Sequence, residues 1–185
     1  MDDASAGEGV AARVGEALRE RGETVAVAEG HTAGRVCARL TREPGASDFL
    51  DRGYCTYSYD SLRDVLAVSR EALDAHGVVS EPVTRAMARA ARDHADATWG
   101  VATTGVAGPG GGDAERPVGT ALVAVAYAAP WGTGASFARV ERYVLDGDRA
   151  AVLAGSVDRA LADLLAAVES TDVAGPAGPE GSEGE

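Results

Sequence analysis

The feature that most constrains the fold is a pair of apolar stretches separated by a glycine-rich segment. Residues 101–104 read Val-Ala-Thr-Thr, and residues 120–127 read Thr-Ala-Leu-Val-Ala-Val-Ala-Tyr. Five glycines lie between them within the eight residues 105–112, which we call the glycine loop. Short apolar runs bounded by glycine and proline are typical of buried strands. The pattern therefore predicts two strands joined by the glycine loop.

The glycine loop has two interpretations. Glycine permits positive φ and a close approach of the backbone, so such a loop can offer amide N–H groups to an anion or a small polar ligand. The alternative is a long flexible hairpin connection, and spacing alone does not separate the two. A P-loop is excluded, because the Gly-Lys-Ser/Thr ending of that motif is absent.

The remaining apolar patterns predict alternating helices and strands. Helical spacing indicates helices at residues 7–21, 35–41, 60–66, 69–76, 81–95 and 148–168, and further strands are expected at residues 24–28, 53–58 and 136–145. Strands that alternate with helices and end in an antiparallel pair predict an α/β protein, a three-layer α/β/α sandwich with a mixed sheet. We expect a single domain over residues 1–168. Residues 169–185 are rich in Gly, Pro, Glu and Ser, and we expect them to be a disordered tail.

The chain is strongly acidic. Seventeen basic residues stand against twenty-nine acidic ones, and the formal charge is −12. This charge disfavours nucleic acid and anionic membranes as partners. All basic residues are Arg, and Lys, Asn and Gln are absent. A GC-rich genome explains this bias without physical selection, whereas adaptation to a halophilic cytoplasm explains it through charge screening, and we favour the second explanation.

Other compositional features indicate a cytoplasmic protein. The two cysteines are too few for a disulfide framework or a zinc site. The first residues, Met-Asp-Asp-Ala-Ser-Ala, lack the basic-then-apolar plan of a signal peptide. No apolar run approaches the length of a membrane-spanning helix.

Four segments together resemble one protein family. They are Val-Ala-Glu-Gly-His-Thr-Ala-Gly at residues 27–34, Gly-Tyr-Cys-Thr-Tyr-Ser at 53–58, the glycine loop with Arg-Pro-Val-Gly-Thr at 116–120, and Gly-Asp-Arg at 147–149. The chain resembles the C-terminal domain of the competence/damage-inducible protein CinA, also known as nicotinamide mononucleotide amidohydrolase, over roughly residues 8–168. This resemblance implies hydrolysis of the carboxamide of nicotinamide mononucleotide, with release of ammonia and with no metal or organic cofactor.

The residues that the family uses for this reaction are replaced. At the position of Gly30, the family has a serine that acts as the nucleophile. At the position of Leu62, the family has a lysine that deprotonates this serine. A serine hydroxyl needs an adjacent base, and a lysine serves as one when its surroundings lower its pKa. Glycine has no side chain and leucine accepts no proton, so the ordinary mechanism is excluded.

Three interpretations of His31, which follows the vacated serine position, stay open. It forms a new catalytic pair with Thr32, it activates water directly, or it is a solvent-exposed turn residue, and we favour the last. We interpret Ser58 as a strand-end or cap hydroxyl and Cys37 as a packing residue. His76 and His94 lie at predicted helix ends and suggest no metal cluster.

Seven further residues match family positions and are our candidate ligand-binding residues: Thr32, Tyr57, Thr104, Gly105, Ala107, Gly108 and Arg149. Arg149, at the start of the last predicted helix, suits a phosphate, because a guanidinium binds oxyanions bidentately and a helix N-terminus favours negative charge. A surface salt bridge with Asp146 or Glu141 is the alternative.

Three functions follow from these observations. The favoured one is a non-hydrolytic member of the family that binds a small nucleotide or a partner. The second is an active amidohydrolase on nicotinamide mononucleotide or a related amide with chemistry centred on His31. The third is a structural domain that associates with further copies of itself.

Overall fold

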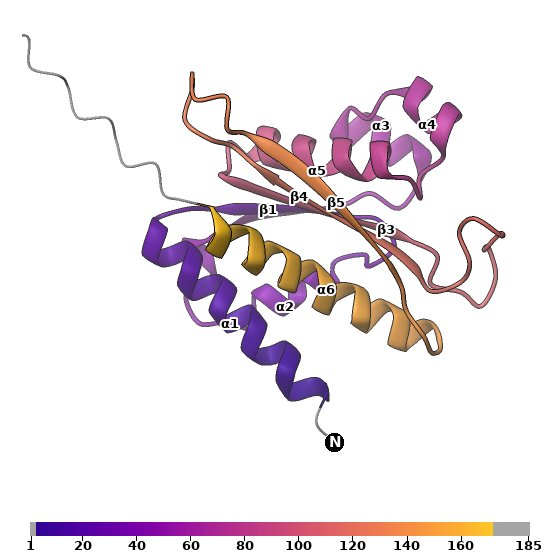
Figure 1. Ribbon diagram of the computed structural model, residues 1–185, viewed down its shortest axis with the longest axis horizontal. Helices are drawn as coiled ribbons and strands as arrows, with labels where there is room; N and C mark the ends of the chain where they lie inside the picture. Colours follow the sequence, from indigo (N-terminus) through magenta and orange to yellow (C-terminus); the bar gives the residue numbers. More distant parts are fainter. Residues whose placement is uncertain (1–2, 172–185) are drawn as a thin grey trace, which may run out of the picture.

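A five-stranded mixed sheet forms the middle layer of the molecule (Figure 1). The computed structural model describes residues 3–171. The strands are β1 (Val25–Glu29), β2 (Leu50–Cys55), β3 (Trp99–Gly105), β4 (Thr120–Tyr127) and β5 (Phe137–Val144). Their order in the sheet is β2-β1-β3-β4-β5. Strands β2, β1 and β3 are parallel to one another, β4 is antiparallel to β3, and β5 is antiparallel to β4.

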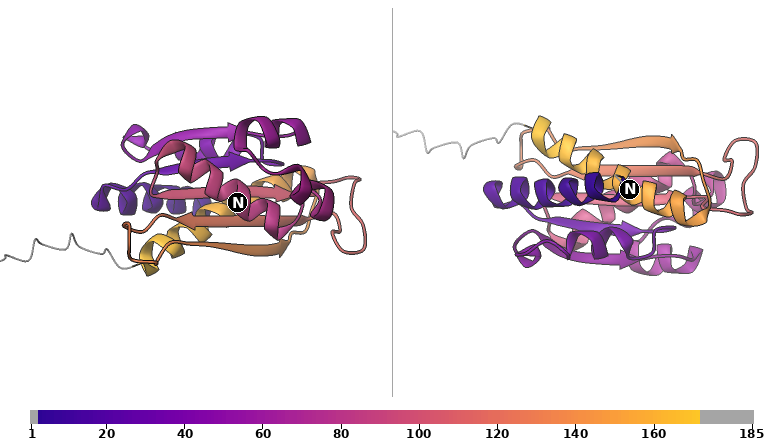
Figure 2. Two further views of the ribbon diagram at one scale, coloured as in Figure 1. Left: turned by 90° about the horizontal axis from the view of Figure 1, so that it is seen from above. Right: turned by 90° about the horizontal axis from the view of Figure 1, so that it is seen from below.

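Helices cover both faces of this sheet, as Figures 1 and 2 show. One face carries α1 (Asp3–Arg21), α2 (Arg35–Leu40) and α6 (Arg149–Ser170). The other carries α3 (Tyr59–Leu66), α4 (Arg70–His76) and α5 (Glu81–Ala95), while a short 3-10 turn (Ala46–Asp48) precedes β2. The three-layer α/β/α sandwich with a mixed sheet is therefore confirmed.

The core has two parts because the central strands are buried on both faces. Side chains alternate between the faces along a strand. Along β3, Val101 faces the α6 side and Ala102 faces the α5 side. The α6 side is filled by Trp99, Phe49, Leu161 and Leu164, and the α5 side by Leu62, Leu66, Val83 and Met87.

The boundaries of several predicted elements differ from the structure. The first helix begins at Asp3 rather than at residue 7. The second strand was predicted at residues 53–58 but spans Leu50–Cys55, because its pairing with β1 starts at Leu50 and the chain leaves the sheet before α3. The last helix continues to Ser170, so residues 169 and 170 of the predicted tail are helical. Residues 172–185 of that tail lie outside the described residues.

The topology brings several chain segments to one edge of the sheet. The parallel strands β1, β2 and β3 end there, and β4 begins there, after the connection at residues 106–119. In open α/β sheets, ligands bind at the carboxyl ends of the parallel strands. Among residues 3–171, no helix is long and apolar enough to cross a membrane.

Candidate functional site

Glu29, the last residue of β1, organises the turn at residues 30–34. Its side chain is fully buried. One carboxylate oxygen accepts hydrogen bonds from Thr32 Oγ1 at 2.7 Å and from Val36 N at 3.1 Å, and the other accepts from Cys37 N at 3.0 Å. Thr103 Oγ1 lies 2.7 Å from Thr32 Oγ1, and since Thr32 donates to Glu29, Thr103 donates to Thr32. Glu29 was not among the predicted site residues, although an acid that ends an apolar strand was a signal available in the sequence.

The two replaced positions, Gly30 and Leu62, lie on the α5 side of the sheet edge. Gly30 N donates to Thr103 O at 2.9 Å, and a Cβ on Gly30 would lie 2.9 Å from the same oxygen and 3.7 Å from Thr104 Cγ2. The Leu62 side chain is 1% exposed and belongs to the apolar cluster that contains Ala28 and Ala102. Position 62 is therefore part of the hydrophobic core in this chain.

His31 points into the protein, which corrects our favoured prediction of an exposed turn residue. The side chain is 8% exposed, and its Nε2 lies 2.9 Å from Ser156 Oγ on α6. The ring has room because residue 105 is a glycine, whose added Cβ would lie 3.0 Å from His31 Nε2. The prediction failed because this space is created by β3 and α6, which are distant in the sequence.

The hydrogen bonds around His31 define its protonation. Ser156 Oγ donates to Val152 O at 2.7 Å, so Ser156 accepts from His31, and Nε2 carries the proton. Nδ1 has no hydrogen-bond partner within residues 3–171. Burial, reinforced by the positive charges of Arg149 and Arg35, lowers the pKa of His31 to about 4 against the opposing effect of Glu29. The imidazole is thus neutral at pH 7.

Arg149 contacts two of the other candidate ligand-binding residues. Its Nη1 donates to Gly108 O in the glycine loop at 2.7 Å, and its Nη2 donates to Tyr57 OH at 3.3 Å. Tyr57 is 67% exposed, so its hydroxyl is accessible at the surface. Among the described residues, Arg149 forms no ion pair with Asp146 or Glu141, and the salt-bridge alternative is therefore wrong.

The other candidate ligand-binding residues are divided between the two faces. Thr104 is buried on the α5 side, where its hydroxyl lies 2.7 Å from that of Thr84. Ala107 is buried on the opposite side, in a small cluster with Val152 and Leu153. The structure thus brings Tyr57, Gly108 and Arg149 together, and it places Thr104 against a different helix.

Three buried polar atoms at this sheet edge have no hydrogen-bond partner among the described residues: His31 Nδ1, Thr56 Oγ1 and Thr120 Oγ1. Thr56 directly follows β2, and Thr120 is the first residue of β4. Buried polar atoms in folded proteins are nearly always hydrogen-bonded, to protein or to ordered water. Each of these atoms therefore marks a position where a water or ligand atom completes the hydrogen bonding.

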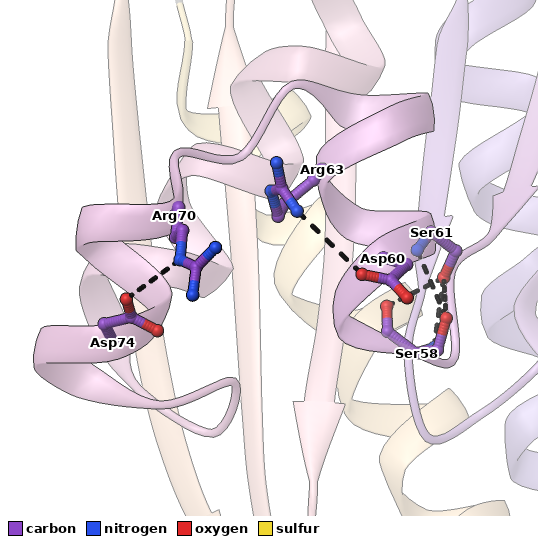
Figure 3. A network of polar contacts seen from close by, with 6 residues as sticks. All are labelled: Ser58, Asp60, Ser61, Arg63, Arg70 and Asp74. Atoms are coloured by element: carbon purple, nitrogen blue, oxygen red, sulfur yellow. Dashed lines mark hydrogen bonds and ion pairs between the residues drawn. The ribbon is translucent and has the colours of Figure 1, made fainter.

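Ser58 acts as a cap, as predicted. Its hydroxyl accepts from Ser61 N at 3.2 Å, and Ser61 Oγ accepts from Ser58 N at 3.0 Å, which forms a capping box at the start of α3 (Figure 3). Cys37 packs against the core, and burial raises the pKa of its thiol, so it is not a reactive thiolate. In the described part of the chain, no three His, Cys, Asp or Glu side chains are grouped so as to hold a metal ion.

Comparison with known proteins yields a consistent set of relatives. The family model of the CinA C-terminal domain matches residues 7–168. A CinA-like protein of Syntrophobacter fumaroxidans is 44% identical over 148 residues, which cover 80% of this chain and 33% of that protein. A CinA-like protein of Anaeromyxobacter is 52% identical over 118 residues, which cover 64% of this chain and 28% of that protein. The chain thus spans about a third of the length of these relatives.

Solved structures show the same fold. The crystal structure of competence damage-inducible protein A from Klebsiella pneumoniae has a TM-score of 0.82 and 31% identity, and the match covers 90% of this chain and 99% of that one. A competence/damage-inducible protein from Agrobacterium tumefaciens has a TM-score of 0.79 and 34% identity, with 88% and 95% covered.

Proposed function

Because the chain belongs to the CinA C-terminal domain family, we propose that it is a member that binds a small nucleotide without hydrolysing it. The observation that carries this proposal is the pair Gly30 and Leu62 at the positions of the family's serine and lysine. Hydrolysis of a carboxamide through a serine needs both an attacking hydroxyl and a base that takes its proton. This chain has neither group at those positions, and it has no lysine anywhere to serve as the base.

The surroundings of the replaced pair still suit a ligand. Backbone N–H groups of the glycine loop do not depend on side-chain identity, so they remain available to a carboxamide or phosphate. Arg149 and the Tyr57 hydroxyl meet beside Gly108 and offer further donors. Loss of the reactive pair therefore removes turnover while it leaves binding groups in place.

A second candidate function is an amidohydrolase centred on His31. It is favoured by the 2.9 Å contact between His31 Nε2 and Ser156 Oγ, which has the spacing of a base and a hydroxyl nucleophile. Two features oppose it. Ser156 is fully buried, and its proton is directed to the Val152 carbonyl rather than to the imidazole.

Ammonia release from nicotinamide mononucleotide separates the two candidates. The wild-type protein and His31→Ala are assayed in dilute buffer and in molar potassium chloride. We expect neither protein to release ammonia above the buffer rate, because removal of a nucleophile and its base eliminates several orders of magnitude of rate. Turnover by the wild type that disappears in His31→Ala would instead establish chemistry centred on this histidine.

Binding is measured separately by calorimetry with nicotinamide mononucleotide and nicotinate mononucleotide in high salt. We expect dissociation constants on the order of micromolar to millimolar. Arg149→Ala is expected to weaken binding by about 1–3 kcal/mol, the range for a charge-assisted hydrogen bond. Arg70→Ala is the matched control, since Arg70 lies on α4 and pairs with Asp74 at the surface (Figure 3). Absence of binding would favour a structural domain that associates with other chains.

A further inference from the structure

A cavity of about 640 Å³ lies between α2 and the first half of α6, and we call it the arginine pocket. Of the ten described residues that line it, four are arginines and Asp148 is the one acidic residue. This concentration of positive charge occurs in a chain whose formal charge is −12. The volume lies within the range of small-molecule sites.

Three of the four arginines lie in a row along α2 and the turn that follows it, and the fourth lies at the start of α6. Arg35, Arg39 and Arg42 are spaced by four and three residues, which places them along one side of α2 and the turn that follows it. At 1.5 Å per residue, this row extends over roughly 10 Å. Arg149 lines the pocket from the start of α6. The positive charge is thus spread along the pocket.

Two of these guanidinium groups are anchored by neutral acceptors. Arg35 Nη1 donates to Thr32 O at 2.8 Å, and Arg149 donates to Gly108 O and Tyr57 OH. Neither forms an ion pair with a described residue, whereas Arg39 lies 3.3 Å from the Asp158 carboxylate. A guanidinium has five N–H donors, so both Arg35 and Arg149 keep donors and an uncompensated charge while their positions are fixed.

The other described lining residues of the arginine pocket are one acidic side chain and five apolar ones. The Asp148 carboxylate accepts from Ala151 N at 2.9 Å as the N-cap of α6, so one of its oxygens is already used. The remaining lining residues are apolar: Ala38, Ala150, Leu153, Ala154 and Val157. An apolar surface beside fixed cationic groups suits an organic anion better than a hydrated inorganic ion.

We propose that the arginine pocket binds a small organic anion that carries two or more phosphate or carboxylate groups. Two or more groups are expected because the backbone positions of the three arginines in the row span about 10 Å, more than the width of one oxyanion. The pocket shares Arg149 with the nucleotide site proposed at the sheet edge, but its other three arginines belong to α2 and the turn that follows it. The proposal therefore goes beyond nucleotide binding and does not require it.

Calorimetry at about 0.15 M potassium chloride tests this proposal with inorganic pyrophosphate, citrate and orthophosphate as probes. We expect pyrophosphate or citrate to bind the wild type about tenfold or more tightly than orthophosphate. The preferred probe identifies phosphate or carboxylate as the recognised group.

Two pairs of variants locate the binding. Ala154 is an exposed lining residue of α6, so Ala154→Glu places a negative charge in the pocket, and Ala154→Gln is its neutral control of equal size. Arg35→Gln removes one pocket charge, and Arg70→Gln removes one charge from the exposed pair with Asp74 on α4. We expect Ala154→Glu to bind about tenfold more weakly than Ala154→Gln, which matches it in size. We expect Arg35→Gln to weaken binding about tenfold, and Arg70→Gln to change it less than about twofold.

Each possible result decides the proposal. Failure of both pyrophosphate and citrate to bind more tightly than orthophosphate would overturn it, as would equal affinities of Ala154→Glu and Ala154→Gln. If Arg35→Gln does not fold, the Ala154 pair still gives the answer, because both substitutions are good helix formers at an exposed position.

Discussion

His31 is a titratable side chain held neutral inside the protein, between Gly105 of β3 and Ser156 of α6. Its charged form is disfavoured because burial removes solvation and because the positive charges of Arg149 and Arg35 lie nearby, and these effects outweigh the opposing effect of Glu29 on the pKa. The folded state therefore resists protonation of this ring, whereas the unfolded chain does not. This difference makes stability depend on pH.

We predict that acid destabilises the protein through His31. Its pKa is about 4 in the folded protein and 6.5 for an unperturbed histidine side chain, so between these values the unfolded state binds more protons. The free energy of unfolding should fall as pH drops from 6.5 to 4, by about 3 kcal/mol in total. Urea denaturation of the wild type and of His31→Leu, measured between about pH 4 and pH 7.5, checks this, because leucine does not titrate.

The comparison of the two proteins isolates the histidine. Burial raises the pKa of Asp163, which also titrates in acid, but this group is present in both proteins and cancels in the difference. The gap in unfolding free energy between wild type and His31→Leu should therefore change with pH in favour of the variant in acid. Parallel curves over the whole range would show that His31 is not buried as a neutral ring.

Single residues also show which parts of the site can be predicted from sequence. Gly30 and Leu62 were singled out by their places in segments that resemble the family, and their identities alone show that neither side chain can serve as a nucleophile or a base. The inward direction of His31 was not predictable, because the space for its ring depends on Gly105 and Ser156. The partners of Arg149 likewise come from Tyr57 and Gly108, which are both distant from it in the chain.

At the scale of elements, the connection between β3 and β4 is held by close backbone contacts. Gly119 N donates to Val106 O at 2.8 Å, and Gly119 O accepts from Leu145 N at 2.9 Å. Gly119 has φ +95°, and a Cβ there would lie 2.1 Å from Leu145 O. By contrast, nothing lies within 4 Å of a Cβ on Gly110.

We predict that Gly119→Ala destabilises the protein by about 2–4 kcal/mol, because it combines a left-handed backbone with an overpacked contact. Gly110→Ala, in the same connection, is the matched control and should change stability by less than about 0.5 kcal/mol. Thermal unfolding of the two variants beside the wild type measures both. Similar melting temperatures for the two variants would contradict the described closure of the connection on Leu145.

The starts of helices were easier to predict than the ends of strands. The starts of α3, α4 and α6 lie within one residue of the predicted ones. Each follows a Ser or Asp whose side chain accepts a hydrogen bond from the first turn, and such a cap is a local feature of the sequence. The limits of β2 depend on its register with β1, in which Leu50 pairs with Val25, and this is not visible in the strand's own residues. Local chemistry thus fixes helix starts, whereas partners distant in sequence fix strand limits.

At the scale of the whole molecule, charge is distributed unevenly. The chain carries twelve excess negative charges, while Arg35, Arg39, Arg42 and Arg149 gather around one cavity. Over the rest of the chain, the remaining arginines are outnumbered by acidic residues. Self-repulsion of this kind opposes the compact state and is relieved by dissolved salt.

We predict that the melting temperature at pH 7 rises by about 10 °C between roughly 0.01 M and 2 M potassium chloride. The Debye length falls from about 30 Å at 0.01 M to about 3 Å at 1 M, so repulsion across the molecule is removed. A gain of a few kcal/mol corresponds to such a shift, at about 2–4 °C per kcal/mol for a chain of this size. The same series at about pH 5 is the control, because protonation of carboxylates reduces the net charge and should reduce the salt effect. A melting temperature that does not respond to salt at pH 7 would favour codon bias over high-salt adaptation as the cause of the Lys-free composition.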